Sequence, residues 1–329
     1  MTQKKLTEKI CLILSINFDM RILVTGATGF IGKTLIPYLI KSGYTEIAIT
    51  VRNIEKANLL FPNQRMNIIH VDEDLSDKII KYNPDIVINL ATYFSGRSDE
   101  STIHKLIESN ITFPTLLLEA LRRTSCKAFV NIGTFTEFVY GAGEKKCNNL
   151  YSATKSALRP IVKFYQQESG WKWFNIIIYS PYGRKNISSK KVIDYLVEAL
   201  DSSDPIPFSG GDQKLDFIHV DDVADFFVRL IERIDDISES FTELHLGSGE
   251  CHSIKDVAFI MEKTFEKKMN ADWGKLSYRE NEAMHTVAPI AKMIKLLKWT
   301  PKITLEEGIR ILKADLNTSD VDQSVKNIN

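Results

Sequence analysis

The strongest constraint on the fold is an alternation of short apolar runs with longer helix-like stretches from Met20 onward. Six of these runs are rich in Val and Ile and almost continuously apolar, as strands are when helices cover both faces of a parallel sheet. They are RILVT (21–25), EIAITV (46–51), MNIIHV (66–71), DIVINL (85–90), KAFVNIG (127–133) and WFNIIIY (173–179). Alternation of this kind is typical of βαβ units. The sequence therefore predicts an α/β fold with a doubly wound parallel sheet.

Composition excludes several classes of function. The chain has 329 residues, of which 44% are hydrophobic, and its 42 basic and 42 acidic side chains cancel. This balance favours neither nucleic acid nor an acidic membrane surface as a partner, and no apolar run reaches the roughly 18 residues of a membrane span. The four cysteines form no CxxC pair and the six histidines form no HExxH motif. We therefore expect no metal site, and a reducing, cytoplasmic environment.

Three glycines directly follow the first predicted strand. The segment LVTGATGFIGKTL places Gly26, Gly29 and Gly32 at the start of a helix. Glycines there allow a tight turn, a close approach of backbone to a pyrophosphate and close packing of helix on strand. A helix N-terminus also offers unpaired N–H groups to phosphates. A tight turn without a ligand is the alternative, but the strand–turn–helix context favours a dinucleotide site.

A tyrosine and a lysine four residues apart form the second motif. Tyr151 and Lys155 in NNLYSATKSAL lie on one face if the segment is a helix. A free tyrosine has a pKa of about 10, and a nearby ammonium group favours its phenolate. We therefore expect a lowered pKa that makes Tyr151 a usable acid. The alternative is that Tyr151 and Lys155 are polar residues on the exposed side of a helix without a function. Their position after the fifth predicted strand favours catalysis.

These motifs resemble those of the extended short-chain dehydrogenase/reductase superfamily, also described as NAD-dependent epimerases/dehydratases. The similarity continues in YSPYGRKN (179–186), GGDQKLDFIHVDDVADFF (210–227) and YRENEAMHTVAPIAKMIKLLKWTPKITLEEGI (278–309), and covers nearly all of residues 20–312. It implies a Rossmann domain at 20–180 and a smaller mixed α/β part at 181–315, some segments of which return to the Rossmann domain. Residues 1–19 are expected to be an extension and 316–329 a tail. The resemblance also implies a homodimer.

The resemblance further implies a coenzyme site. Its expected residues are Gly26, Thr28, Gly29, Phe30, Ile31, Gly32, Arg52, Leu90, Ala91, Thr92, Tyr151, Lys155, Tyr179 and Pro181. The second strand ends in ITVRN, with Arg52 and no acidic residue. An acidic residue here usually binds the free ribose hydroxyl of NAD, whereas an arginine accommodates the 2′-phosphate of NADP. We therefore expect NADP(H) rather than NAD(H), with a solvated loop arginine as the alternative.

The same resemblance assigns the catalytic residues. Thr134 is expected to hold the substrate oxygen, with Thr136 as its competitor, while Tyr151 supplies a proton and Lys155 binds the nicotinamide ribose. Sugar-nucleotide dehydratases carry Thr-Asp-Glu at Thr134, Phe135 and Thr136. Glu137 is one position late and is expected on the opposite face of a strand extension. Dehydration is therefore not predicted. The short interval before Tyr151 resembles the abequose and paratose synthase type of 4-keto-6-deoxy sugar nucleotide reductase.

Substrate contacts are expected in the second half of the chain and after the fourth strand. The expected residues are Tyr93, Thr136, Ser180, Lys214 and Arg279. Leu215 stands where the family often has a phosphate-binding arginine. Asp221 or Asp222 is expected to cap the following helix, and Pro114 to bend the helix that carries Asn110. Phe94 is a further candidate for the sugar pocket, although core packing explains it equally well. Arg184, Lys185 and Lys190 could add positive charge, but a role as solvated loop cations is favoured.

The predicted function is NADP-dependent reduction of the C4 keto group of a CDP- or dTDP-linked 4-keto-6-deoxyhexose. A nucleotide-sugar 4-epimerase, which uses the same residues, is the first alternative. A dinucleotide-binding sensor or scaffold without turnover is the second. Tyr151 and Lys155, both present, favour the two enzymes over the sensor.

Overall fold

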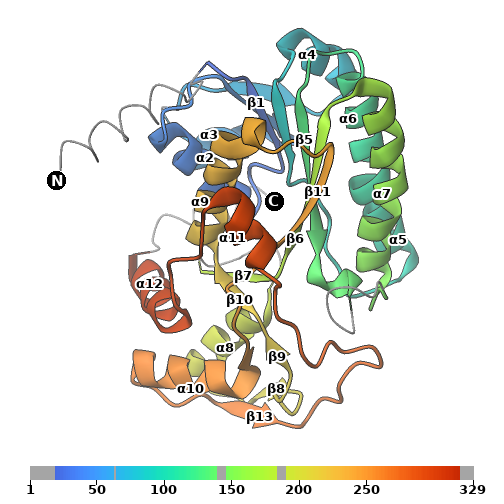
Figure 1. Ribbon diagram of the computed structural model, residues 1–329. Helices are drawn as coiled ribbons and strands as arrows, with labels where there is room; N and C mark the ends of the chain where they lie inside the picture. The colour runs from blue at the N-terminus through green and yellow to red at the C-terminus, as the bar shows by residue number, and fades with distance from the viewer. Residues whose placement is uncertain (1–18, 63, 139–145, 184–189, 319–329) are drawn as a thin grey trace, which may run out of the picture.

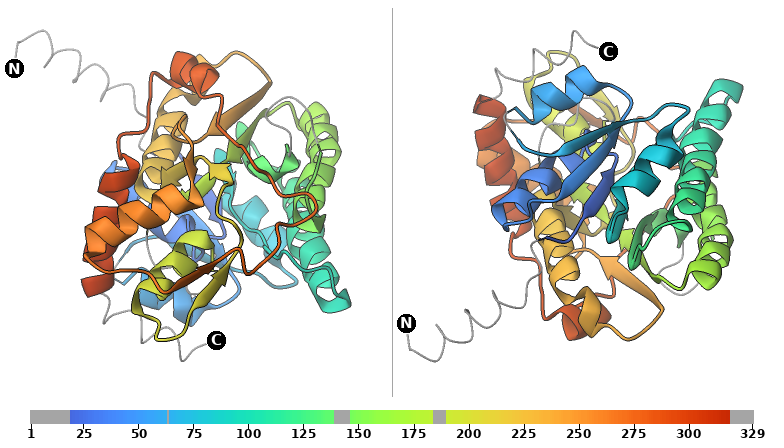
Figure 2. Two further views of the ribbon diagram at one scale, coloured as in Figure 1. Left: turned by 90° about the horizontal axis from the view of Figure 1, so that it is seen from below. Right: turned by 90° about the horizontal axis from the view of Figure 1, so that it is seen from above.

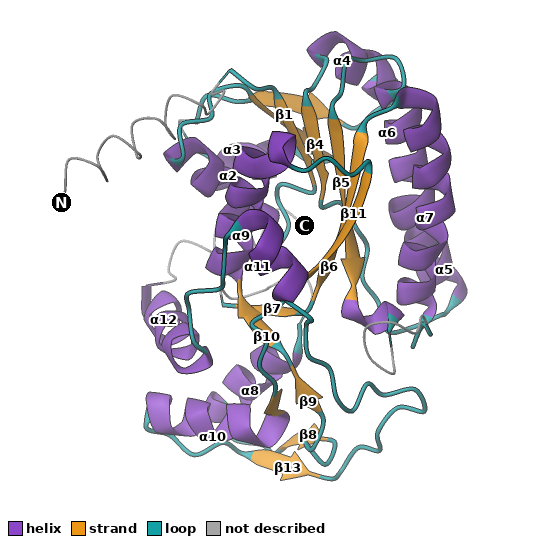
Figure 3. Ribbon diagram, in the orientation of Figure 1, coloured by secondary structure: helices purple, strands orange, loops and turns teal. Residues whose placement is uncertain are grey.

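A seven-stranded parallel sheet forms the centre of the molecule. The structure, a computed structural model, describes residues 19–62, 64–138, 146–183 and 190–318. The strand order is β11-β6-β5-β4-β1-β2-β3 (Figure 1; Figure 3). The bounds are β1 Ile22–Thr25, β2 Ile47–Val51, β3 Asn67–His70, β4 Ile86–Asn89, β5 Ala128–Thr134, β6 Lys172–Ile178 and β11 Phe241–Leu246. The predicted doubly wound α/β sheet is confirmed.

Six strands lie where the sequence predicts them, to within about two residues at each end, but a seventh was missed. Strands β1, β2, β4 and β5 are buried along their whole length, which explains their continuous apolar runs. Strand β11 is one of the two edge strands, with the sequence FTELHL, and its side chains alternate between exposed or half-buried and buried. The prediction of six strands was incomplete because it relied on continuous apolar runs, which this strand lacks.

Helices cover both faces of the sheet (Figure 2). On one face lie α2 Gly32–Lys41, α3 Ile54–Leu60, α9 Val220–Arg233 and α11 Ala291–Leu297. On the other lie α4 Leu75–Tyr82, α6 Phe113–Leu121 and α7 Leu150–Ser169, with α5 Glu100–Ile107 packed beside α7. None of the helices in the described part of the chain is long and apolar enough to cross a membrane.

A smaller part with its own core follows the sixth strand. It contains helices α8 Val192–Asp201, α10 Ile254–Phe265 and α12 Leu305–Thr318. Its strand pairs are β7 Ser180–Tyr182 with β10 Phe217–His219, β9 Lys214–Leu215 with β12 His252–Ser253, and β8 Ile206–Phe208 with β13 Ala271–Trp273. Strand β11 and helix α11 return to the large sheet. Residues 1–18 of the expected extension and 319–329 of the expected tail lie outside the described residues.

The predicted cap of α9 was wrong. The helix begins at Val220, and the preceding His219 accepts a hydrogen bond from the Asp221 N–H at 3.3 Å. Asp222 is buried and instead accepts from the N–H groups of Lys302 and Ile303, at 3.1 and 2.9 Å. This carboxylate therefore anchors the segment before α12, a contact that only the tertiary fold creates.

Pro114 lies in the first turn of α6, where a missing N–H is tolerated. A π-helical turn, η1 Glu108–Thr112, joins α5 to α6. The prediction that Pro114 bends this helix is therefore not confirmed; the irregularity is the π-helical turn before it, which carries Asn110 toward α7.

Candidate active site

The glycine turn lies where the strand order reverses, between β1 and β4. Gly26 has a φ of 65°, and a Cβ there would lie 2.7 Å from the Ala91 nitrogen and the Leu90 carbonyl carbon. A Cβ on Gly32 would lie 2.5 Å from Ala27. The turn therefore requires glycine at both positions, and it leaves the N-terminus of α2 in the crevice where such sheets bind dinucleotides.

The other expected coenzyme residues fall into two groups. Leu90, Ala91 and Thr92 follow β4 beside Gly26, and the Ala91 N–H donates to Thr25 Oγ1 at 3.1 Å. Thr28, Gly29, Phe30 and Ile31 surround the start of α2 and are half-buried. Arg52 is exposed just after β2.

Tyr179 and Pro181 stand at the end of β6 and in β7. The Tyr179 side chain is buried, stacks on Phe135 and lies 3.1 Å from His245 Nδ1 through its hydroxyl. A coenzyme contact by Tyr179 is therefore restricted to its backbone. The glycine turn and the adjacent α2 N-terminus fit a nicotinamide dinucleotide, which supplies hydride chemistry when bound.

Tyr151 and Lys155 lie one turn apart in the first half of α7, as predicted. Asn149 caps this helix: its Oδ1 accepts from the Ser152 N–H at 2.9 Å, and Ser152 Oγ accepts from the Asn149 N–H at 3.2 Å. The Tyr151 ring meets Phe94 edge to face, with centroids 4.9 Å apart. The pair is thus held on a capped helix, with Tyr151 half-buried and Lys155 almost fully buried.

Burial dominates the protonation of both side chains. It raises the pKa of Tyr151 to about 12, against the lowering effect of a hydrogen bond with Thr92. It lowers the pKa of Lys155 to about 8, while the negative charge of Glu137 acts in the opposite direction. The expected lowering of the Tyr151 pKa was therefore wrong, because burial outweighs the effects that lower it. Tyr151 holds its proton at neutral pH, in the form that a general acid requires.

Thr134 and Thr136 lie together after β5. Their hydroxyl oxygens are 3.0 Å apart, and the Thr136 N–H donates to Thr134 Oγ1 at 3.3 Å. The short helix η2, Phe135–Glu137, turns the chain back at this point. Glu137 is therefore fully buried and accepts from the Thr134 N–H at 2.9 Å. Its expected place on the opposite face of a strand extension was wrong.

Asn110 joins the loop after β4 to α7. Its Oδ1 accepts from Thr92 Oγ1 at 2.9 Å and from the Tyr93 N–H at 3.0 Å. Its Nδ2 donates to the Tyr93 carbonyl at 3.1 Å and to Thr154 Oγ1 at 3.0 Å. This buried amide fixes Thr92 against the helix that carries Tyr151.

The structure brings only some of the expected substrate residues together. Tyr93 is half-buried and Phe94 exposed in the loop after β4. The Arg279 guanidinium lies beside Gly96 of this loop, since a Cβ there would be 3.8 Å from Arg279 Nη1. Arg279 therefore lies against the loop whose Phe94 contacts the Tyr151 ring.

The other expected substrate residues have no contact with Tyr151 among the interactions of the described residues. The Ser180 N–H donates to the Asp216 carbonyl at 3.0 Å, within the β7–β10 pair. Lys214 is exposed on β9, so its role at the substrate stays a prediction. Lys190 pairs with Glu198 at 2.6 Å, while Arg184 and Lys185 lie outside the described residues.

Sequence reasoning missed Lys191, the N-cap residue of α8. Its Nζ lies 5.1 Å from the centroid of the Phe30 ring and donates to the Pro181 carbonyl at 3.3 Å. Burial lowers the pKa of this ammonium group to about 8. A cation therefore lies beside the glycine turn. The adjacent lysine, Lys190, carried the same signal in the sequence, and only packing distinguishes the two.

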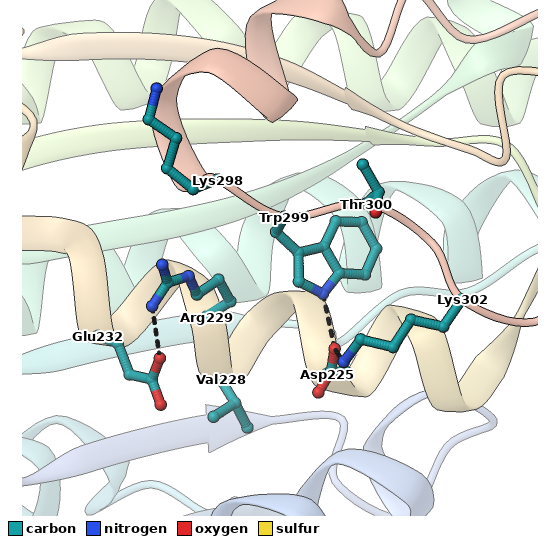
Figure 4. Close-up of a pocket in the computed structure, with 8 residues that line it drawn as sticks. All are labelled: Asp225, Val228, Arg229, Glu232, Lys298, Trp299, Thr300 and Lys302. Carbon is teal, nitrogen blue, oxygen red and sulfur yellow. Dashed lines mark hydrogen bonds and ion pairs between the residues drawn. The ribbon is translucent and has the colours of Figure 1, made fainter. Parts of the chain in front are cut away.

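A surface pocket of about 330 Å³ lies on α9 and the segment after α11 (Figure 4). Its polar groups largely pair with one another: Trp299 Nε1 donates to Asp225 Oδ2 at 2.6 Å, and Arg229 pairs with Glu232 at 3.1 Å. Helix α9 covers the face of the sheet opposite to α7. This pocket is therefore separate from the tyrosine–lysine pair. Among the described residues, no group of three or more His, Cys, Asp or Glu side chains is arranged to hold a metal ion.

Comparison with known proteins identifies a family. Residues 22–242 match the NAD dependent epimerase/dehydratase family. The chain is 26% identical to a CDP-abequose synthase of Yersinia pseudotuberculosis over 265 residues, covering 80% of this chain and 91% of the relative. It is also 26% identical to a UDP-glucuronate 4-epimerase of Thermodesulfobacterium geofontis, covering 88% of this chain and 93% of the relative.

Solved structures show the same fold. A mutant UDP-glucuronic acid 4-epimerase from Bacillus cereus, in complex with UDP-4-deoxy-4-fluoro-glucuronic acid and NAD, superposes with a TM-score of 0.80. The two chains are 23% identical, and the match covers 91% of this chain and 99% of the other.

Proposed function

We propose, from the premise that the chain belongs to the NAD dependent epimerase/dehydratase family, that it is an NADP-dependent nucleotide-sugar 4-ketoreductase. Its substrate would be a CDP- or dTDP-linked 4-keto-6-deoxyhexose, reduced at C4 for the synthesis of deoxysugar-containing glycans. The family and its superfamily, the extended short-chain dehydrogenases/reductases, support a nucleotide-sugar enzyme. The choice of a reductase within this class rests on the residues of the candidate active site described above.

The observation that carries the proposal is the combination of Tyr151, protonated on α7, with two threonine hydroxyls at the start of η2, a segment that packs against α7 and lacks the Asp of the dehydratases. Phe135 stands between Thr134 and Thr136, and Glu137 is engaged with the Thr134 backbone. Such a site supplies one proton and holds one oxygen, which is what carbonyl reduction needs. The similarity to a CDP-abequose synthase supports the same class of substrate.

In the proposed mechanism, Tyr151 donates its proton to the C4 carbonyl oxygen as that oxygen gains negative charge. Thr134, with Thr136 at hydrogen-bonding distance, holds this oxygen in place. Lys155 lies one helical turn after Tyr151 on α7. Its ammonium group stabilises the tyrosinate that forms when Tyr151 gives up its proton, and it binds the nicotinamide ribose. The bound nicotinamide supplies the hydride.

The choice of coenzyme rests on Arg52. It is exposed at the end of β2, where an arginine is suited to a 2′-phosphate. We therefore propose NADP(H), although NAD occupies the Bacillus cereus structure of similar fold.

A 4-epimerase is the second candidate, favoured by the similarity to a UDP-glucuronate 4-epimerase. Tyr151, Lys155 and Thr134 would serve it equally well, since an epimerase removes and returns hydride at the same carbon. The two functions differ in their net consumption of coenzyme.

The test is an absorbance assay on the purified protein. NADPH and NADH are titrated first, and CDP- or dTDP-4-keto-6-deoxyglucose is then added. We expect loss of NADPH absorbance equal to the keto sugar added. Bound coenzyme without net consumption would contradict the reductase, and turnover of a UDP-sugar to its C4 epimer under those conditions would establish the second candidate.

A further inference from the structure

A row of polar side chains crosses five strands of the buried sheet. Thr25, Asn89, Asn131, Asn175 and Glu243 occupy paired positions on β1, β4, β5, β6 and β11. Each donates to the next, at 2.7, 3.2, 3.1 and 2.9 Å. Buried amides that satisfy one another in sequence form a rigid, directional chain of hydrogen bonds.

This row ends at a buried arginine between two carboxylates. Arg159 of α7 donates from Nη1 to Glu243 and from Nε to Glu137 Oε2, the latter at 2.9 Å. The other oxygen of Glu137 accepts from the Thr134 N–H at 2.9 Å. The carboxylate therefore links the arginine to the backbone of the threonine that the proposed mechanism uses.

Arg159 lies on the same face of α7 as the proposed catalytic residues. Tyr151, Lys155 and Arg159 are spaced four residues apart, so they follow one another along one face of the helix. Next to them, a Cβ on Gly133 would lie 2.8 Å from Glu137 Oε1. The absence of a side chain at Gly133 therefore leaves room for the carboxylate.

Burying these charges is costly, and apolar side chains of similar volume often stabilise a fold at least as well. Glu137 is 0% exposed and Arg159 is 8% exposed. General stability is thus a weak explanation for a buried ion pair one helical turn from Lys155. A role in the chemistry explains both the charges and their position.

We propose that Glu137 is a positioning residue of this site: it holds the Thr134 backbone and presents its negative charge to Lys155, while Arg159 and the polar row fix its orientation. This inference rests on the proposed function for its turnover measurements. It goes beyond that function because it assigns a role to an acid that belongs to no motif of the chain.

The charge of Glu137 acts on both members of the catalytic pair. It raises the pKa of Lys155 and also that of Tyr151. Within the described residues, the other titratable groups around this cluster are Arg159 on α7, Glu243 and His245 on β11, Tyr179 after β6, and Cys147 before α7. Removal of the Glu137 charge lowers both pKa values, so Lys155 and Tyr151 lose their protons at lower pH.

Two substitutions separate charge from position. Glu137→Gln removes the charge and can place an amide N–H group opposite the Arg159 N–H donor. We therefore expect kcat to fall about 10- to 100-fold. The alkaline limb of its pH–kcat profile should also move about one unit lower. Glu137→Asp keeps the charge but shortens the reach to Thr134. Its kcat should fall, while its alkaline limb stays in place.

A purely structural role predicts equal losses in both variants without a shift of the limb, and this result would overturn the proposal. Thermal unfolding of each variant checks that it folds. If Glu137→Gln does not fold, Glu137→Asp still decides, because a kcat equal to that of the unchanged protein removes the positioning role.

A measurement without sugar substrate keeps this inference distinct from the proposed function. NADPH binding, followed by nicotinamide fluorescence, should weaken as Lys155 loses its proton, and the midpoint should be lower in Glu137→Gln. An unchanged midpoint contradicts the inference even if the enzyme reduces a keto sugar. A shifted midpoint with no turnover of any keto sugar leaves the inference standing and removes the proposed reductase.

Discussion

Tyr151 and Lys155 lie one turn apart on α7, yet burial acts on their protons in opposite directions. The phenol is held neutral, with a pKa raised to about 12, whereas the ammonium group is brought to a pKa of about 8. A neutral phenol beside an ammonium is the charge state from which carbonyl reduction begins. The protonation state of Tyr151 therefore suits a residue that donates a proton better than one that removes a proton.

Tyr151→Phe removes the proposed acid and leaves the ring against Phe94. We expect kcat to fall by about 10² to 10⁴ because positioned acid catalysis contributes about that much. NADPH affinity should change little, which a fluorescence titration measures. As a control, Tyr195→Phe alters an exposed tyrosine on α8 and should leave kcat unchanged. Near-normal turnover by Tyr151→Phe would contradict the mechanism.

The lowered pKa of Lys155 predicts a pH dependence of coenzyme binding. Below a pH of about 8 the side chain carries its positive charge, and above that value the charge is lost. NADPH affinity should therefore decrease as the pH rises through about 8, whereas an unperturbed lysine, with a pKa of about 10.4, would show no change there. Lys155→Met should bind weakly and with a smaller transition, because burial also lowers the pKa of Lys191, beside the glycine turn, to about 8. The same transition in Lys155→Met would assign it to another group.

At the scale of elements, the turn between β1 and α2 depends on backbone conformations that only glycine adopts easily. Gly26 combines a positive φ with the close approach of the segment after β4. Gly170, which ends α7 with a φ of 74°, has open space around it. Both glycines have a positive φ, but only at Gly26 would a Cβ collide with neighbouring backbone atoms.

Gly26→Ala and Gly170→Ala separate these demands. A positive φ costs a residue with a Cβ about 1–2 kcal/mol, and denaturant unfolding should show a loss of this size for Gly170→Ala. Gly26→Ala should lose more stability because its Cβ meets the Ala91 nitrogen at 2.7 Å. It should also lose NADPH affinity, whereas Gly170→Ala should keep it. Equal effects of the two substitutions would show that close approach at the turn is unimportant.

For the whole molecule, several large apolar side chains are exposed on three neighbouring helices. Helices α5, α6 and α7 expose Ile103, Ile107, Leu116 and Phe164. Exposed apolar groups on neighbouring helices mark an association surface more often than scattered ones do. The family resemblance implies a homodimer, and we propose that it pairs through these helices.

Phe164→Glu tests the proposed dimer. Its side chain is 56% exposed on α7, and a charge there should favour the monomer in light scattering coupled to size-exclusion chromatography. Phe259→Glu is the matched control, because Phe259 is 65% exposed on α10, outside the proposed interface. A dimer that survives Phe164→Glu and dissociates with Phe259→Glu would relocate the interface.

Local signals in the sequence determined much of the fold and part of the site. Continuous Val- and Ile-rich runs predicted six strands because the central ones are buried on both faces, whereas β3 at one edge is only partly buried. Edge strand β11 lacks that signal, since its side chains alternate in exposure. The glycine turn and the Tyr151–Lys155 spacing were readable because their geometry involves neighbours in the chain.

Tertiary structure decided the features that depend on distant segments. Whether Asp222 caps its own helix or anchors residues before α12 depends on how the chain returns. The raised pKa of Tyr151 comes from burial, which residue spacing cannot show. The partnership of Glu137 with Arg159 joins residues 22 positions apart. Burial and charge pairing are set by packing across the fold, so they appear only when the sheet and its helices are assembled.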